Sequence, residues 1–170
     1  MIKIFDPRPC SLGEGPLWHP LRQELFWFDI TAHQLLSVSK MWQFDEHVSA
    51  AGWISQNQLL IASESQLLNF NLIKETQTKI CDLESGNPVT RSNDGRADPQ
   101  GGFWIGTMGW KMEKDKGAIY RYYRRELRKL FHPITIPNSI CFTPSGETAY
   151  FTDTSEQKIM RVIKPHTYVI

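Results

Sequence analysis

The sequence predicts an all-β chain that forms part of a β-propeller, and two observations lead to this prediction. Short runs of aromatic and β-branched residues recur between clusters of Gly, Pro, Asn and Ser, as strands do between turns. These runs occupy residues 25–28, 58–61, 102–105 and 148–151. Counted between Phe26, Leu60, Trp104 and Tyr150, they stand 34, 44 and 46 residues apart. A four-stranded propeller blade takes roughly 40–45 residues, so each run indicates one blade.

The spacing divides the chain into successive blades of one partial propeller domain over residues 1–170. We expect blade 1 at residues 14–46, blade 2 at 47–88, blade 3 at 89–133 and an incomplete blade 4 at 134–170. Helical periodicity is scarce. The charged stretch 121–131 fits two strands and a turn as readily as one helix.

Three prolines in polar turns, Pro20, Pro99 and Pro144, align blades 1, 3 and 4 with one another. Six residues before each proline stands an oxygen-bearing side chain, and these are Glu14, Asn93 and Asn138. The first strand of each blade lines the central channel, so equal positions in different blades point at a common axis. We therefore expect the three side chains to meet around one metal ion.

Each of these residues also has an ordinary explanation when it is taken singly. Glu14 between two glycines is typical of a solvated loop acid, Asn93 before Asp94-Gly95 is typical of a turn, and Asn138 after Pro137 fits a turn as well. Only the shared register favours the metal site. Blade 2 has no oxygen ligand in that register and is expected to be purely structural.

Carboxylate and carboxamide oxygens are hard ligands that suit Ca²⁺, Mg²⁺ or Mn²⁺. A mixed site of this kind also holds Zn²⁺ or Fe²⁺. The sequence therefore predicts one divalent ion and leaves its identity open.

Composition excludes several classes of partner. Lys and Arg total 19 against 18 Asp and Glu, and a net charge of +1 exerts no long-range attraction on nucleic acid or an anionic membrane. No apolar run approaches the roughly 20 residues that span a bilayer, and no signal peptide is evident, so we expect a cytoplasmic protein. The cysteines Cys10, Cys81 and Cys141 are expected to be reduced thiols.

Other functional patterns are weaker. Arg and Tyr alternate over residues 121–129 as in single-stranded nucleic-acid binding, but the net charge and the expected outer-strand position argue against it. There is no G-x-S-x-G elbow of a serine hydrolase. The five histidines are scattered without ligand spacing and are expected on surfaces or in turns. The six tryptophans are expected to pack the blades rather than to form a sugar platform.

Five motifs resemble the SMP-30/gluconolactonase family, in the family's order and roughly its spacing. They occupy residues 12–18, 90–95, 106–108, 136–139 and 150–154. The resemblance implies a six-bladed propeller that hydrolyses a sugar lactone with one divalent metal ion. It implies that Glu14 and Asn138 are metal ligands and that Arg91 and Asn93 hold the substrate beside the metal.

The resemblance also implies a further metal-binding Asp, the general base, which falls in a later blade beyond residue 170. Asp153 lies nine residues after Pro144, as Asp29 lies nine after Pro20, and this register favours a structural carboxylate over a replacement ligand. Two functions therefore remain open: a lactone hydrolase impaired by the loss of its last blades, and a metal-binding or interaction module without turnover.

The short length predicts a second consequence for assembly. In the family, the chain ends pair to close the ring, so residues 3–5 would join the last blade. An arc of under four blades leaves open strand edges and uncovered apolar faces. We expect self-association or a complementing chain at these edges.

Overall fold

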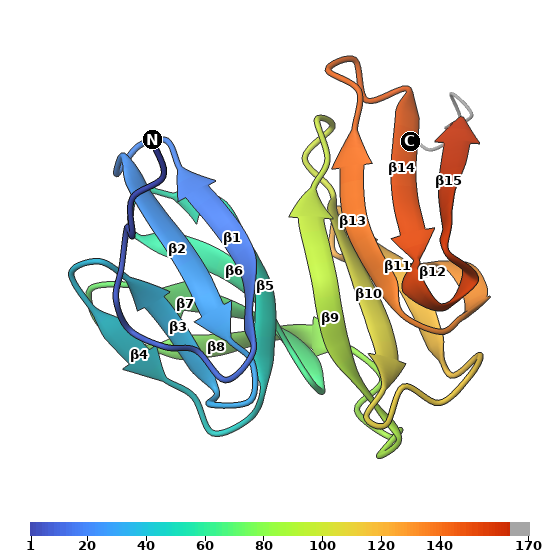
Figure 1. Ribbon diagram of the computed structural model, residues 1–170, viewed down its shortest axis with the longest axis horizontal. Helices are drawn as coiled ribbons and strands as arrows, with labels where there is room; N and C mark the ends of the chain where they lie inside the picture. Colours follow the sequence, from blue (N-terminus) through green and yellow to red (C-terminus); the bar gives the residue numbers. More distant parts are fainter. Residues whose placement is uncertain (164–170) are drawn as a thin grey trace.

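The computed structural model describes residues 1–163, and its regular structure is almost entirely β (Figure 1). The first sheet has the order β1-β2-β3-β4 and contains β1 (Gly13–His19), β2 (Glu24–Asp29), β3 (Gln34–Ser37) and β4 (Met41–Gln43). The second has the order β5-β6-β7-β8 and contains β5 (Val48–Ser55), β6 (Gln58–Ser63), β7 (Gln66–Asn71) and β8 (Gln77–Asp82).

The third sheet has the order β12-β11-β10-β9 and contains β9 (Thr90–Ala97), β10 (Phe103–Gly109), β11 (Gly117–Tyr123) and β12 (Glu126–Ile134). The fourth has the order β13-β14-β15 and contains β13 (Pro137–Phe142), β14 (Thr148–Asp153) and β15 (Lys158–Ile163). A single-turn helix, η1 (Thr154–Glu156), connects β14 to β15. Every neighbouring pair is antiparallel, as in the blades of a propeller.

These sheets confirm the all-β propeller prediction and agree with the four expected blades. The charged stretch 121–131 forms the end of β11, a turn and most of β12, so the two-strand alternative is correct. The remainder of the expected fourth blade, residues 164–170, lies outside the described residues.

The first strand of each sheet lies on the inner side of the arrangement. β5 contacts β1 on one side and β9 on the other, and β9 in turn contacts β13 (Figure 1). The starts of these strands therefore gather residues that are far apart in the sequence.

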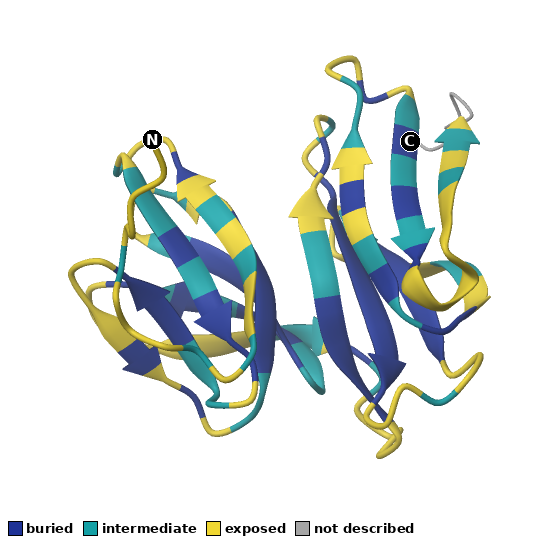
Figure 2. Cartoon of the chain, viewed as in Figure 1, coloured by how far each residue is buried: buried dark blue, intermediate teal, exposed yellow. Residues whose placement is uncertain are grey.

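Apolar side chains fill the spaces between successive sheets. Phe26 and Phe28 of β2 pack with Ile61 of β6 between the first two sheets, and all three are fully buried. On β14, buried side chains alternate with partly exposed ones, as expected of a strand with one face on the core (Figure 2). Period-2 patterning thus explains which face of β14 is buried, whereas β10 is buried along its whole length and on both faces.

The expected roles of the aromatic residues are confirmed only in part. Trp104 packs in the core and is 2% exposed, whereas Trp18 and Trp53 are 57% and 44% exposed and do not serve as buried packing residues.

The expectation of a surface position is wrong for His19, which is fully buried. Its Nε2 bonds to the Ser55 carbonyl at 3.0 Å, and its Nδ1 accepts from an amide, so both ring nitrogens are satisfied.

Asp29 and Asp153 occupy equivalent structural positions, as their shared register predicts. Asp29 accepts hydrogen bonds from the backbone amides of Ser11 and Leu12, just before β1. Asp153 accepts from two amides just before β13 in the same way. Each carboxylate therefore fixes the entry of an inner strand.

The outer surfaces carry some apolar side chains. On the edge strand β15, Ile159 and Ile163 are 76% and 67% exposed. Residues 3–5 form no strand, and Phe5 contacts the ring of Trp27 instead. Self-association at such edges stays a prediction.

Within residues 1–163, no helix is both long and apolar enough to cross a bilayer.

Candidate functional site

The residues predicted for the site all lie in the first strands of their sheets. Register shifts follow Glu14 in β1 and Asn138 in β13, and Asn93 lies within the shift of β9 against β10. Such bulges redirect side chains out of the regular alternation. Arg91 stands two residues before Asn93 on β9, and each is 8% exposed.

Asn93 is the centre of a hydrogen-bonded line across two blades. Its Nδ2 donates to Oδ1 of Asn138 and to the carbonyl of Pro137, each at 3.0 Å. Its Oδ1 accepts from Nη1 of Arg91 at 3.1 Å. The structure thus brings Arg91, Asn93 and Asn138 together, although 45 residues separate the two asparagines.

Glu14 joins this group through charge rather than through a hydrogen bond. Burial lowers the pKa of Arg91, and the negative charge of Glu14 acts in the opposite direction. Since Glu14 itself is exposed, it offers its carboxylate toward solvent beside a buried cation. A guanidinium keeps its charge even when it is buried, so a cation and a carboxylate face each other here.

Asp94 is a neighbour that the sequence pattern did not single out, because Asn93-Asp94-Gly95 fits an ordinary turn. Burial raises the pKa of Asp94, an effect opposed by the amide of Ile140, which donates to its Oδ2 at 2.8 Å. The charge of Glu14 raises the pKa of Asp94 further. Two carboxylates therefore interact at this end of β1 and β9.

Blade 2 supports the site without a ligand in the expected register. Oγ of Ser49 on β5 donates to Oγ of Ser92 at 2.7 Å, and both side chains are buried. On the other side, a Cβ at Gly15 would stand only 2.3 Å from the Ser49 carbonyl oxygen. β5 is thus packed closely against both β1 and β9, which agrees with a structural role for this blade.

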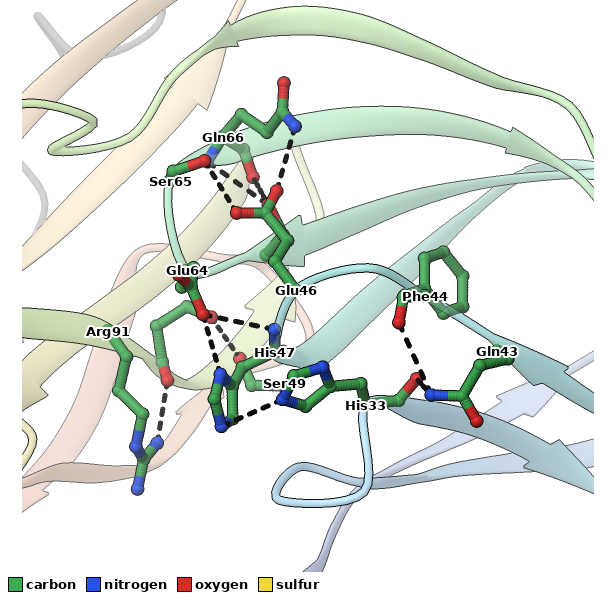
Figure 3. Close-up of polar contacts among 12 residues, drawn as sticks. His33, Gln43, Phe44, Glu46, His47, Ser49, Glu64, Ser65, Gln66 and Arg91 are labelled. Atoms are coloured by element: carbon green, nitrogen blue, oxygen red, sulfur yellow. Dashed lines mark hydrogen bonds and ion pairs between the residues drawn. The ribbon is translucent and has the colours of Figure 1, made fainter.

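A second polar group lies beside Arg91 at the same end of the strands. His47, just before β5, contacts Glu64 through its Nδ1 at 2.6 Å and His33 through its Nε2 at 3.2 Å (Figure 3). The rings of Trp110 and His47 lie edge to face with their centroids 4.5 Å apart, and the guanidinium of Arg91 lies 5.9 Å from the centroid of the Trp110 ring. The sequence spacing does not predict this group, because its members lie in four different connections between strands. They are His33, His47, Glu64 and Trp110.

The side-chain atoms at this site that are suited to coordinate a metal ion are oxygens. Among residues 1–163 there is no cluster of three or more His, Cys, Asp or Glu side chains suited to a metal ion. Glu14 and Asp94 supply two interacting carboxylates, and the amide of Asn138 supplies a carbonyl oxygen. This donor set fits a hard divalent cation, because such ions prefer carboxylate and amide oxygens completed by water.

Comparison with known proteins identifies one family. Residues 12–164 match the family model of the SMP-30/Gluconolactonase/LRE-like region. A protein of Rhizobium meliloti (strain 1021) with the provisional name sugar lactone lactonase is 40% identical, over 97% of this chain and 58% of its own length. The L-arabinolactonase of Azospirillum brasilense is 31% identical, over 88% of this chain and 53% of its own length.

A solved structure shows the same fold. It is a calcium-binding protein, regucalcin, from Agrobacterium tumefaciens strain C58, with a TM-score of 0.91 and 40% identity over 94% of this chain. This chain covers 56% of that structure's chain. It therefore spans between 53% and 58% of the length of these three relatives.

Proposed function

The chain belongs to the SMP-30/gluconolactonase/LRE-like family, and on this premise we propose that it serves the metal-dependent hydrolysis of a sugar lactone. Relatives named as lactonases support the reaction class. The observation that carries the proposal is the line of hydrogen bonds from Arg91 through Asn93 to Asn138, with Glu14 acting on Arg91 by charge.

In this proposal Arg91 and Asn93 bind the sugar. Asn93 does so through the remaining lone pair of its Oδ1, because both hydrogens of its amide are already donated. Within the described part of the chain, the hydrogen bonds of Arg91 use only Nη1, which leaves Nε and Nη2 available to donate to substrate oxygens. A guanidinium donates several hydrogen bonds in fixed directions and keeps its charge when buried. Asn93 is held on both sides of its amide, so it orients Arg91 before a ligand arrives.

Glu14 and Asn138 would hold the metal ion. A divalent ion bound by them would polarise the lactone carbonyl and stabilise the oxyanion of the tetrahedral intermediate. The hydrogen bond that Asn138 accepts from Asn93 fixes its amide so that the remaining lone pair of Oδ1 faces away from Asn93. The ion's identity among Ca²⁺, Mg²⁺, Mn²⁺, Zn²⁺ and Fe²⁺ is left to experiment.

The same site supports a second function, which is binding of metal and sugar without turnover. Arg91, Asn93 and Asn138 bind and orient a ligand but do not exchange a proton near neutral pH, whereas turnover also needs a general base. Removal of a general base costs about 10²–10⁴-fold in rate. Metal binding and turnover therefore have to be measured separately on this chain.

Proton release from gluconolactone tests the proposal, with each of the five ions supplied in turn. We expect release above the buffer rate with at least one ion, and a loss of that excess in Glu14→Gln. The matched control is Glu126→Gln, an exposed carboxylate on β12, which should leave the rate unchanged.

Calorimetric titration with the same ions separates the two functions. Metal binding that requires Glu14, together with a rate at the buffer level, would select the binding function. Equal rates for the unchanged protein and for Glu14→Gln would overturn the metal-dependent hydrolysis.

A further inference from the structure

Trp110 lies at the same end of the third sheet as the proposed sugar-binding residues. It directly follows β10, and its backbone N–H donates to the carbonyl of Val89 at 3.0 Å. One residue earlier, Gly109 pairs with Thr90, and before it Met108 pairs with Arg91. The strand pairing therefore brings Trp110 next to the start of β9.

The Trp110 ring contacts two polar side chains. The ring is absent from all three buried core clusters, and the residue is 37% exposed. Its neighbours are the imidazole of His47, edge-to-face at 4.5 Å, and the guanidinium of Arg91 at 5.9 Å. Packing of the blade core thus does not account for a large apolar side chain at this position.

His47 gives the indole a fixed support. Its Nδ1 bonds to Glu64 at 2.6 Å and its Nε2 to His33 at 3.2 Å, so the imidazole is held from two sides (Figure 3). The turn that carries Trp110 is also fixed, because Oε2 of Glu113 accepts from the amide of Lys111 at 2.9 Å. A ring held in this way loses little conformational entropy when a ligand packs on it.

We propose that Trp110 forms a stacking subsite for the ring of a sugar lactone, next to the polar contacts made by Arg91. This inference rests on the proposed function and extends it to the shape of the ligand. A cyclic sugar presents a flat array of C–H groups on one face and hydroxyl groups at its edge. An exposed indole matches the flat face, and a guanidinium beside it matches the edge oxygens.

The subsite discriminates between the substrate and the product of hydrolysis. Opening of the lactone breaks the bond between the ring oxygen and the carbonyl carbon. Water adds its oxygen to the carbonyl carbon and one proton to the ring oxygen, its second proton is released, and the product is an open-chain aldonate. An open chain has no flat face and packs poorly on an indole. Trp110 should therefore favour the ring over the aldonate and assist product release.

Calorimetric titration with two ligands tests this inference. One is the six-membered lactam analogue of the sugar lactone, which keeps the ring and resists hydrolysis, and the other is the open-chain aldonate. We expect Trp110→Ala to weaken lactam binding by about tenfold, in the range of an aromatic contact with its buried area. Aldonate binding should change much less. The matched control is Trp18→Ala, an exposed tryptophan near the other end of β1, which should bind both ligands normally.

Fluorescence gives a second readout that does not depend on the folding of an alanine variant. Addition of the lactam should change the emission of the unchanged protein and of Trp18→Phe, and this change should disappear in Trp110→Phe. Lactam binding equal in Trp110→Ala and the unchanged protein, or an equal loss of both ligands, would overturn the subsite. Failure of the unchanged protein to bind the lactam would instead overturn the proposed function.

Discussion

The side-chain amide of Asn93 donates a 3.0 Å hydrogen bond to Oδ1 of Asn138, which joins the inner strand of the third sheet to that of the fourth. Asn93 is 8% exposed, and both ends of its amide are engaged. This one side chain therefore links two blades and also positions Arg91.

Removal of the Asn93 amide should destabilise the fold as well as the site. Asn93→Ala leaves a buried guanidinium and the carbonyl of Pro137 without these bonds, and the expected loss in the free energy of unfolding is about 1–3 kcal/mol. Urea denaturation measures it. Asn57→Ala, at an exposed asparagine, should change stability by less than about 0.5 kcal/mol. Equal losses in the two variants would contradict this role.

Gly15 is required by the close packing of β1 on β5. It adopts a φ of +59°, and a Cβ there would stand 2.3 Å from the Ser49 carbonyl oxygen and 2.9 Å from the Phe28 ring. Gly15→Ala should thus incur both backbone strain and a clash. Gly101, with a φ of +83° and no neighbour within 4 Å, isolates the strain alone, which costs roughly 1–2 kcal/mol.

The comparison of these two glycines has a definite expected order. Thermal or urea unfolding should show a clearly larger loss of stability for Gly15→Ala than for Gly101→Ala. The displaced strand should also move Glu14, so divalent-metal binding should weaken only in Gly15→Ala. Similar stability losses in both variants would show that β5 shifts to accommodate the added methyl group without a further loss of stability.

The sequence predicts the repeat and part of the site for a physical reason. Propeller blades repeat the same strand pattern, so the turn prolines and the carboxylates Asp29 and Asp153 reveal which positions are equivalent. Arg91 and Asn93 are neighbours on one strand. Asn138 is 45 residues further along, and only blade register predicts its contact with Asn93, which the structure confirms.

Other parts of the site lie outside that register. Trp110 and His47 stand in connections whose length and path differ between blades, so no repeat marks them as neighbours. The burial of His19 depends on the hydrogen bond between its Nε2 and the Ser55 carbonyl. Such contacts depend on how two blades pack together, and pattern analysis of a single strand does not contain that information.

A buried ion pair in the third sheet should be more important for stability than any exposed pair. Oδ2 of Asp98 accepts from Nε of Arg121 at 2.6 Å and from the indole of Trp104 at 3.0 Å. Asp98→Ala leaves the buried Arg121 without this carboxylate, and the expected loss is about 3–5 kcal/mol. Glu126→Ala, which removes an exposed partner of Arg128, should cost at most about 1 kcal/mol. Denaturant unfolding that ranks the two variants equally would contradict this assignment.

Asp29 should make the stability of the fold depend on pH. Burial raises the pKa of Asp29, but four hydrogen bonds together lower it more: those from the amides of Leu12, Ser11 and Ala32 and from the Thr31 hydroxyl. The net pKa therefore lies below the usual value. A depressed pKa in the folded state means that the folded form binds protons less readily than the unfolded chain. The stabilisation is therefore complete above the ordinary Asp pKa of about 3.9 and is lost as pH falls through the lower folded value.

Asp29→Asn tests this linkage by removing the titration while keeping the size of the side chain. At pH 7 the variant should be about 1–3 kcal/mol less stable, because an amide cannot accept every bond that the carboxylate accepts. Below pH 4 the difference from the unchanged protein should shrink, since protonation removes the same charge. Urea unfolding at a series of pH values measures both effects, and Asp45→Asn, an exposed carboxylate before β5, serves as the control. A constant difference between the Asp29 variant and the unchanged protein from pH 7 to pH 3 would show that this carboxylate stabilises β1 by shape and not by charge.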